Sequence, residues 1–144
     1  MIEGVGNSGA YYQEYKTIDD IKQQQIIQQL RMIEQKVKAH EMAHKVAGGE
    51  LAGSVHYEYK KGPDGKLYIV GGEVPIKIKE GRTPQETIEI AQKIKRAALA
   101  PADPSPQDRA VAARAAMLEM KARIELQKQQ QENNNQHEKI DIFV

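Results

Sequence analysis

Hydrophobic residues recur at spacings of three and four over the first long segment after residue 17. The stripe consists of Leu30, Ile33, Val37, His40 and His44. Such spacing predicts one face of an α-helix. Thr17 offers an N-cap, with two carboxylates in the turn that follows, and Gly48-Gly49 supplies a C-terminal stop. We therefore expect a long helix between these two signals.

After this helix the period of the hydrophobic pattern changes to two. Residues 55–60 and 66–70 are β-prone and flank the turn sequence Gly62-Pro63-Asp64-Gly65. This arrangement predicts an antiparallel β-hairpin. Gly71-Gly72 then interrupts the pattern, and residues 73–78 are expected to form a third short strand with Pro75 at an edge.

Two further helices are indicated in the C-terminal half. Thr83-Pro84-Gln85-Glu86 combines an N-cap, a proline at the first helical position and a glutamate three residues on. Three prolines between residues 101 and 106 end that helix, and Ser105-Pro106-Gln107-Asp108 starts another in the same way. Their apolar stripes are Ile88, Ala91, Ile94 and Ala98, and then Val111, Ala115, Leu118 and Ala122.

Together these elements predict an α+β fold with one structured domain at residues 17–126. Residues 1–16 are expected to be a flexible N-terminal segment, because glycines interrupt any period. Residues 127–144 are expected to be a polar linker or tail with an apolar C-terminus. That apolar end would either dock on its own domain, on a second copy or on another protein, or form a frayed terminus. Its large apolar residues are Ile140, Ile142, Phe143 and Val144.

The composition excludes several classes of function. The chain has 144 residues and carries 21 Lys and Arg against 20 Asp and Glu, so its net charge is +1. This balance gives no general attraction to nucleic acid. Without cysteine there is no disulfide, thiolate zinc ligand or thiol nucleophile. No apolar run is long enough for a membrane span and no secretory signal is present, which favours a cytoplasmic protein.

One motif points to specific chemistry: His40-Glu41-Met42-Ala43-His44, an HExxH sequence within the predicted long helix. Residues four apart share a helix face, so both imidazoles can reach one zinc ion. The glutamate beside the first histidine can act as general base on a water that the metal activates. The alternative is that both histidines are hydrogen-bonded groups of the core.

A hydrolytic zinc site also needs a third protein ligand. The spacings usual for a third histidine are not met, since positions 48 and 50 hold Gly48 and Glu50. His137 lies in the polar tail and is a poor candidate. Glu73 stands out because two glycines precede it, although a surface residue after a turn is equally compatible with that spacing. The open candidates are His56, Glu50, Glu58, Glu73, Glu89, Asp103 and Asp108.

Two short signatures carry a family resemblance. They are Ala39-His40-Glu41 (AHE) and Gly71-Gly72-Glu73-Val74 (GGEV), within a match from about residue 36 to residue 122. The chain resembles the SprA-related family, whose bacterial members are described as zinc metalloproteases. The resemblance implies that Glu73 is the third zinc ligand, and it lowers the standing of His56.

We therefore predict a zinc metallopeptidase that binds Zn²⁺ through His40, His44 and Glu73 and uses Glu41 as general base. Its partner would be a peptide or protein substrate, which the edge of the hairpin could hold by strand addition. The alternative from another class is a binding or scaffold protein whose site holds structural zinc or no metal. A structural site has four protein ligands, whereas a hydrolytic site keeps one position open.

Overall fold

The computed structural model describes residues 17–142, and the side chains of residues 17–138. The expected flexible segment 1–16 lies outside the described residues. The contacts divide the chain into two units. Within the described residues, the first unit comprises 17–37 and 57–71, and the second comprises 38–56 and 72–142.

The long helix predicted after residue 17 is α2 (Ile18–Gly48). Its start is a reciprocal cap. The Asp20 N–H donates to Thr17 Oγ1 over 3.2 Å, and the Thr17 N–H donates to Asp20 Oδ2 over 3.3 Å. The helix ends at Gly48, and a short 3₁₀ helix, η1 (Gly49–Leu51), follows. Both termini agree with the sequence signals.

The predicted hairpin is formed by β1 (His56–Lys61) and β2 (Leu67–Glu73), which pair as a two-stranded antiparallel sheet. In its turn the Gly65 N–H donates to the Gly62 carbonyl over 3.0 Å. Gly65 has a φ of 79°, a left-handed conformation that glycine adopts readily in such turns. The hairpin therefore follows from local signals.

The expectation that Gly71-Gly72 ends this pattern is wrong, because β2 continues through both glycines to Glu73. A Cβ on Gly71 would lie 2.9 Å from Oε2 of Glu58 in β1. Glycine here makes room for the neighbouring side chain rather than ending the strand.

The predicted third strand at residues 73–78 is not a strand of the sheet. This stretch makes one isolated antiparallel bridge, between Ile76 and Ala52. Its two hydrogen bonds run from the Lys77 N–H to the Leu51 carbonyl and from the Gly53 N–H to the Pro75 carbonyl, each 2.8 Å long. Pro75 has no N–H of its own, which limits how far such pairing can extend.

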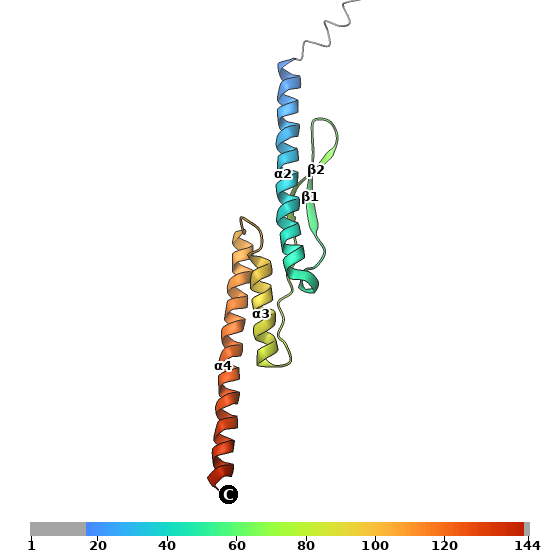
Figure 1. The fold of residues 1–144 in the computed structure, drawn as a ribbon. Coiled ribbons are helices and arrows are strands. Elements are labelled where there is room, and N and C mark those ends of the chain that lie inside the picture. Colours follow the sequence, from blue (N-terminus) through green and yellow to red (C-terminus); the bar gives the residue numbers. More distant parts are fainter. Residues whose placement is uncertain (1–16, 143–144) are drawn as a thin grey trace, which may run out of the picture. The chain divides into compact units, whose positions relative to one another are not determined.

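The core of the second unit lies between α3 (Pro84–Ala98) and α4 (Pro106–Ile142), which run side by side (Figure 1). The predicted stripe of α3 is buried in full. From α4, mainly small side chains are buried: Ala112, Ala115 and Ala122. Small residues at the contact let two helices approach closely. The α+β fold class predicted from the sequence is confirmed.

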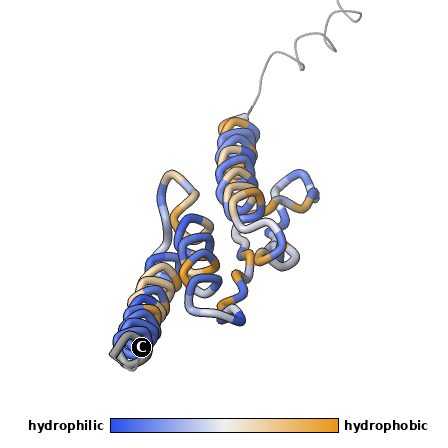
Figure 2. The backbone as a smooth tube through the Cα atoms, turned by 60° about the horizontal axis from the view of Figure 1, so that its bottom comes forward, coloured by the Kyte–Doolittle hydropathy of each residue, from blue (hydrophilic) through white to orange (hydrophobic). Residues whose placement is uncertain are grey.

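The polar segment 127–136, expected to be a linker or tail, continues as helix α4. Residues 127–138 are exposed throughout, and Figure 2 shows this end of the helix as a hydrophilic tube. The predicted docking of the apolar C-terminus falls on side chains outside the described residues. Among residues 17–142, no helix combines the length and hydropathy that crossing a membrane requires.

Candidate metal centre

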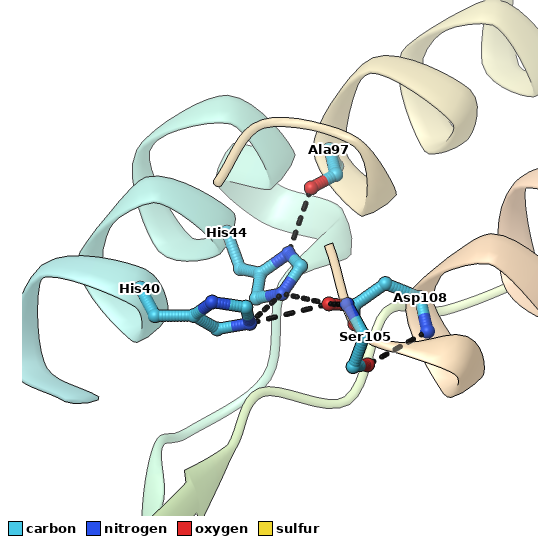
Figure 3. A network of polar contacts seen from close by, with 5 residues as sticks. All are labelled: His40, His44, Ala97, Ser105 and Asp108. Atoms are coloured by element: carbon cyan, nitrogen blue, oxygen red, sulfur yellow. Dashed lines mark hydrogen bonds and ion pairs between the residues drawn. The ribbon is translucent and has the colours of Figure 1, made fainter. Parts of the chain in front are cut away.

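The two histidines of the HExxH motif lie one turn apart on α2, within the second unit (Figure 3). Their rings meet edge to face, with centroids 4.9 Å apart. The side chain of His40 is 26% exposed and that of His44 only 3%. The Nε2 atoms are 3.2 Å apart, so the helix aims both at one point.

A backbone carbonyl fixes the tautomer of His44. Its Nδ1 lies 2.8 Å from the carbonyl oxygen of Ala97, in the last turn of α3. A carbonyl can only accept, so Nδ1 carries the proton and donates it. In the neutral ring Nε2 then carries a lone pair, which lies 3.2 Å from Nε2 of His40. Orientation of a histidine through its second nitrogen is typical of metal ligands.

Asp108 meets the two histidines from the first turn of α4. Its Oδ2 lies 3.2 Å from His40 Nε2 and 3.1 Å from His44 Nε2. The same oxygen accepts the Ser105 N–H over 2.9 Å, while the Asp108 N–H donates to Ser105 Oγ over 3.1 Å. Burial alone would raise the pKa of Asp108. The hydrogen bonds with Ser105 and the nearby imidazoles outweigh it and hold the pKa below the usual range.

These three side chains fit a metal ion. Their ligand atoms form a nearly equilateral triangle with edges of 3.1–3.2 Å. Tetrahedral zinc with bonds of about 2.0–2.1 Å places its ligand atoms about 3.3–3.4 Å apart. Moreover, the lone pair of His44 and the carboxylate of Asp108 face each other, and both are acceptors. A cation between them removes that repulsion.

Glu41, the glutamate of the HExxH motif, is a buried carboxylate. It is 3% exposed, and its buried Oε2 has no hydrogen-bond partner among the described residues. Burial raises the pKa of Glu41, with the histidines acting in the opposite direction and the charges of Asp108 and Glu73 adding to the rise. Buried carboxylate oxygens normally accept a hydrogen bond, so a bound water or ligand is expected to donate one to Glu41 Oε2.

A cavity of about 490 Å³ opens onto these groups. One wall is the stretch from Gly72 to Ile76, which includes the bridge to Ala52. The start of α4 forms another wall, and Arg114 is the only lysine or arginine among the lining residues. Glu73 also lines this cavity, from the exposed end of β2. It is not one of the three residues whose ligand atoms lie within 4.8 Å of one another.

The other ligand candidates are not among the residues that line the cavity. Neither His56, which is exposed at the start of β1, nor the exposed Asp103 lines the cavity. Glu50 pairs with Lys93 over 3.8 Å. Glu58, Glu89 and His137 are likewise exposed and absent from the cavity wall.

Sequence reasoning gave Asp108 only as one open carboxylate among several, and it missed the parts of Ser105 and Ala97. Ser105 had a usable signal, because its spacing to Asp108 is that of a helix cap whose acid folds back. The Ala97 carbonyl had none, because it is a backbone atom brought to His44 by tertiary packing.

Comparison with known proteins adds one finding. A family model, the SprA-related family, matches residues 10–144, nearly the whole chain. The chain belongs to the SprA-related family. No curated protein and no solved structure matches it. This match confirms the family resemblance, and it shows neither an activity nor a metal.

Proposed function

We propose that this protein is a zinc-dependent peptidase in which Glu41 acts as general base. The observation that carries the proposal is the meeting of His40 Nε2, His44 Nε2 and Asp108 Oδ2 at 3.1–3.2 Å. Beside them, in the same cavity, lies a buried carboxylate oxygen without a partner among the described residues. Three ligands and a nearby base are the parts that metal-assisted hydrolysis requires.

In this proposal His40, His44 and Asp108 hold the metal. Two imidazoles and one carboxylate suit zinc, which when bound supplies a Lewis acid and lowers the pKa of a coordinated water to about 7. The Ala97 carbonyl keeps the His44 lone pair directed inward, and Ser105 keeps the Asp108 carboxylate in place. The protein thereby pre-orients two of the three ligands before any ion arrives.

Glu41 has the position and the environment of a proton carrier. Burial raises the pKa of this carboxyl, which makes the carboxylate a stronger base than an exposed glutamate. It takes a proton from the attacking water as the new carbon–oxygen bond forms. It then gives that proton to the amine nitrogen that leaves when the peptide C–N bond breaks.

The cavity wall supports a peptide as the substrate. The bridge between Ile76 and Ala52 is made by the carbonyl of Pro75 and the N–H of Lys77. Within the described residues, the N–H and carbonyl of Ile76 itself therefore make no backbone hydrogen bond. In an antiparallel pair of this type, the N–H and carbonyl of the bridged residue point to the opposite edge. That edge is available to an extended peptide by strand addition. We place the substrate there rather than on the hairpin edge.

The third ligand is where this proposal departs from the family resemblance. The resemblance implied Glu73, which lines the cavity, whereas the atoms that converge on the histidines are those of Asp108. Three clustered ligands also favour an open hydrolytic site over a closed structural one, for which four are usual. We therefore propose Asp108 as ligand, and the role of Glu73 remains a prediction to be tested separately.

The test compares Glu41→Gln with Glu50→Gln, a control whose side chain is 80% exposed and absent from the cavity wall. Each variant is loaded with zinc and assayed on a mixture of quenched fluorogenic peptides. We expect Glu41→Gln to bind zinc as the wild type does and to lose about 10²–10⁴-fold in hydrolysis. A chelator should stop the wild type, and zinc should restore it. Hydrolysis that survives Glu41→Gln, or a zinc-loaded wild type that cleaves none of the peptides, would contradict the proposal.

A further inference from the structure

The face of α4 turned away from α3 carries large apolar side chains in water. Met117, Met120 and Ile124 are 73%, 65% and 48% exposed. Their spacings of three and four continue toward the helix start through Ala110 and Ala113, both exposed. We call these five residues the α4 seam. Helical periodicity places them opposite the alanines that α4 buries, so the packing against α3 leaves the seam uncovered.

A shallow hollow of about 340 Å³ runs along the seam. It is lined by residues of α4 alone: Met117, Met120, Lys121, Ile124, Glu125 and Lys128. No other element within the described part of the chain contributes to it. A stripe of alternating three and four spacings is the pattern that a second helix fills by knobs-into-holes packing.

The charges beside the seam are mostly positive. Periodicity puts Arg109 and Arg123 along one flank, and Lys121 and Lys128 along the other. Lys121 and Arg123 are 68% and 58% exposed, and Lys121 lies 3.9 Å from the exposed Glu80. Glu125 is the exposed carboxylate on this stretch, since Glu119 is only 14% exposed and pairs with Lys95 and Arg123. The seam is therefore framed by cations in a chain of net charge +1.

The apolar stripe and its basic flanks distinguish between three possible occupants of the seam: a second copy of the chain, a lipid surface and an acidic helix. A second copy would bring the same cations against these ones in either orientation, which is destabilising. A lipid surface suits a broad apolar face with Trp, Phe or Leu, whereas the α4 seam is narrow and holds Ala, Met and Ile. An acidic helix would match both the apolar stripe and its basic flanks.

We propose that the α4 seam docks an amphipathic helix of another protein whose flanks carry Glu or Asp. The alanines at the start of the seam allow close approach of the two backbones, and the methionines adapt to the partner's side chains. The cations pair with the partner's carboxylates along both flanks. This inference does not depend on the peptidase proposal, because the seam lies on a different face of α4 from the cavity.

The test uses the full chain and a synthetic helical peptide of about four heptads, with Ile and Leu at the core positions and Glu at the flanks. We expect one-to-one binding by calorimetry that weakens as salt is raised. Met120→Ser should weaken it at least about tenfold. Met32→Ser, which alters a methionine 59% exposed in α2 and outside the HExxH motif, should not. Circular dichroism and zinc affinity should be unchanged in both variants.

Further experiments test the charge preference of the seam and the two other occupants, a lipid surface and a second copy of the chain. The same peptide with Lys at its flanks should not bind, and Lys121→Glu combined with Lys128→Glu should abolish binding of the acidic peptide. The proposal is overturned if the acidic peptide does not bind or if Met32→Ser weakens binding as much as Met120→Ser. It is equally overturned if the seam instead binds vesicles of anionic phospholipid, or if sedimentation shows self-association that Met120→Ser removes.

Discussion

Helices α3 and α4 begin with almost the same four residues, Thr83-Pro84-Gln85-Glu86 and Ser105-Pro106-Gln107-Asp108. The two caps are also built in a similar way. The Glu86 N–H donates to Thr83 Oγ1 over 3.1 Å, and the Asp108 N–H donates to Ser105 Oγ over 3.1 Å. In each case the acid folds back to a backbone N–H over 2.9 Å, that of Arg82 for Glu86 and that of Ser105 for Asp108.

The two starts differ in what else the acid meets. Glu86 is exposed, and among the residues described its carboxylate accepts only the Arg82 N–H. The Oδ2 of Asp108 also lies 3.1–3.2 Å from His44 and His40. In the proposed site, an ordinary helix cap becomes a metal ligand because another element brings two imidazoles to it. The cap would then have a second use, because it fixes the carboxylate in the orientation that a metal would need.

The largest expected difference between the two starts is in zinc affinity. Asp108→Ala removes a ligand and should weaken zinc binding by more than about 100-fold, beyond the loss typical of groups that only orient ligands. Glu86→Ala should leave zinc affinity unchanged. Competition with a chromophoric chelator measures both. Equal affinities in the two variants would remove the distinction between these helix starts.

Zinc should also stabilise the fold, and this stabilisation should depend on Asp108 and not on Glu86. At a free zinc concentration about 100 times the Kd, binding adds about 2.7 kcal/mol to the free energy of unfolding. Urea denaturation with zinc and with a chelator should give this difference in the wild type and in Glu86→Ala. In Asp108→Ala it should be largely absent; if it persists, the stabilising site lies elsewhere.

The hydroxyls of Thr83 and Ser105 should contribute equally to stability as helix caps. Without metal, Thr83→Ala and Ser105→Ala should each lower the free energy of unfolding by about 1 kcal/mol. Only Ser105→Ala should weaken zinc binding as well, by up to about tenfold, because it loosens the turn that holds Asp108. A similar loss of zinc affinity in Thr83→Ala would mean that the effect is general destabilisation.

The smallest effect is expected from the acid at the end of β2. Glu73→Ala should change zinc affinity by less than about threefold, because its carboxylate acts on the ion only through screened charge. The same chelator competition decides this. A loss as large as that of Asp108→Ala would restore Glu73 as the third ligand that the family resemblance implied.

The features predicted well from the sequence depend on neighbours in the chain. The caps at Thr17, Thr83 and Ser105 have spacings of three residues, and the two histidines have a spacing of four. The hairpin turn likewise lies within a few residues. In each case the chemistry and the geometry are set by the same short segment.

What could not be predicted depends on contacts between distant segments. Asp108 and His40 are 68 positions apart, and no local rule distinguishes this carboxylate from Asp103. Likewise, Gly71 continues a strand because it faces Glu58, a fact that belongs to the pairing of β1 with β2. The helical state of residues 127–138 was missed for another reason: their polar composition has no apolar period to indicate a helix.

The most direct test of the central claim is an anomalous diffraction map of the zinc-loaded protein at the zinc absorption edge. We expect one zinc ion bound to His40 Nε2, His44 Nε2 and an Asp108 carboxylate oxygen, at about 2.0–2.2 Å from each. We expect no protein atom in the remaining position. A peak that joins the histidines to Glu73 instead of Asp108, a fourth protein ligand, or no zinc at these histidines would contradict the proposed site.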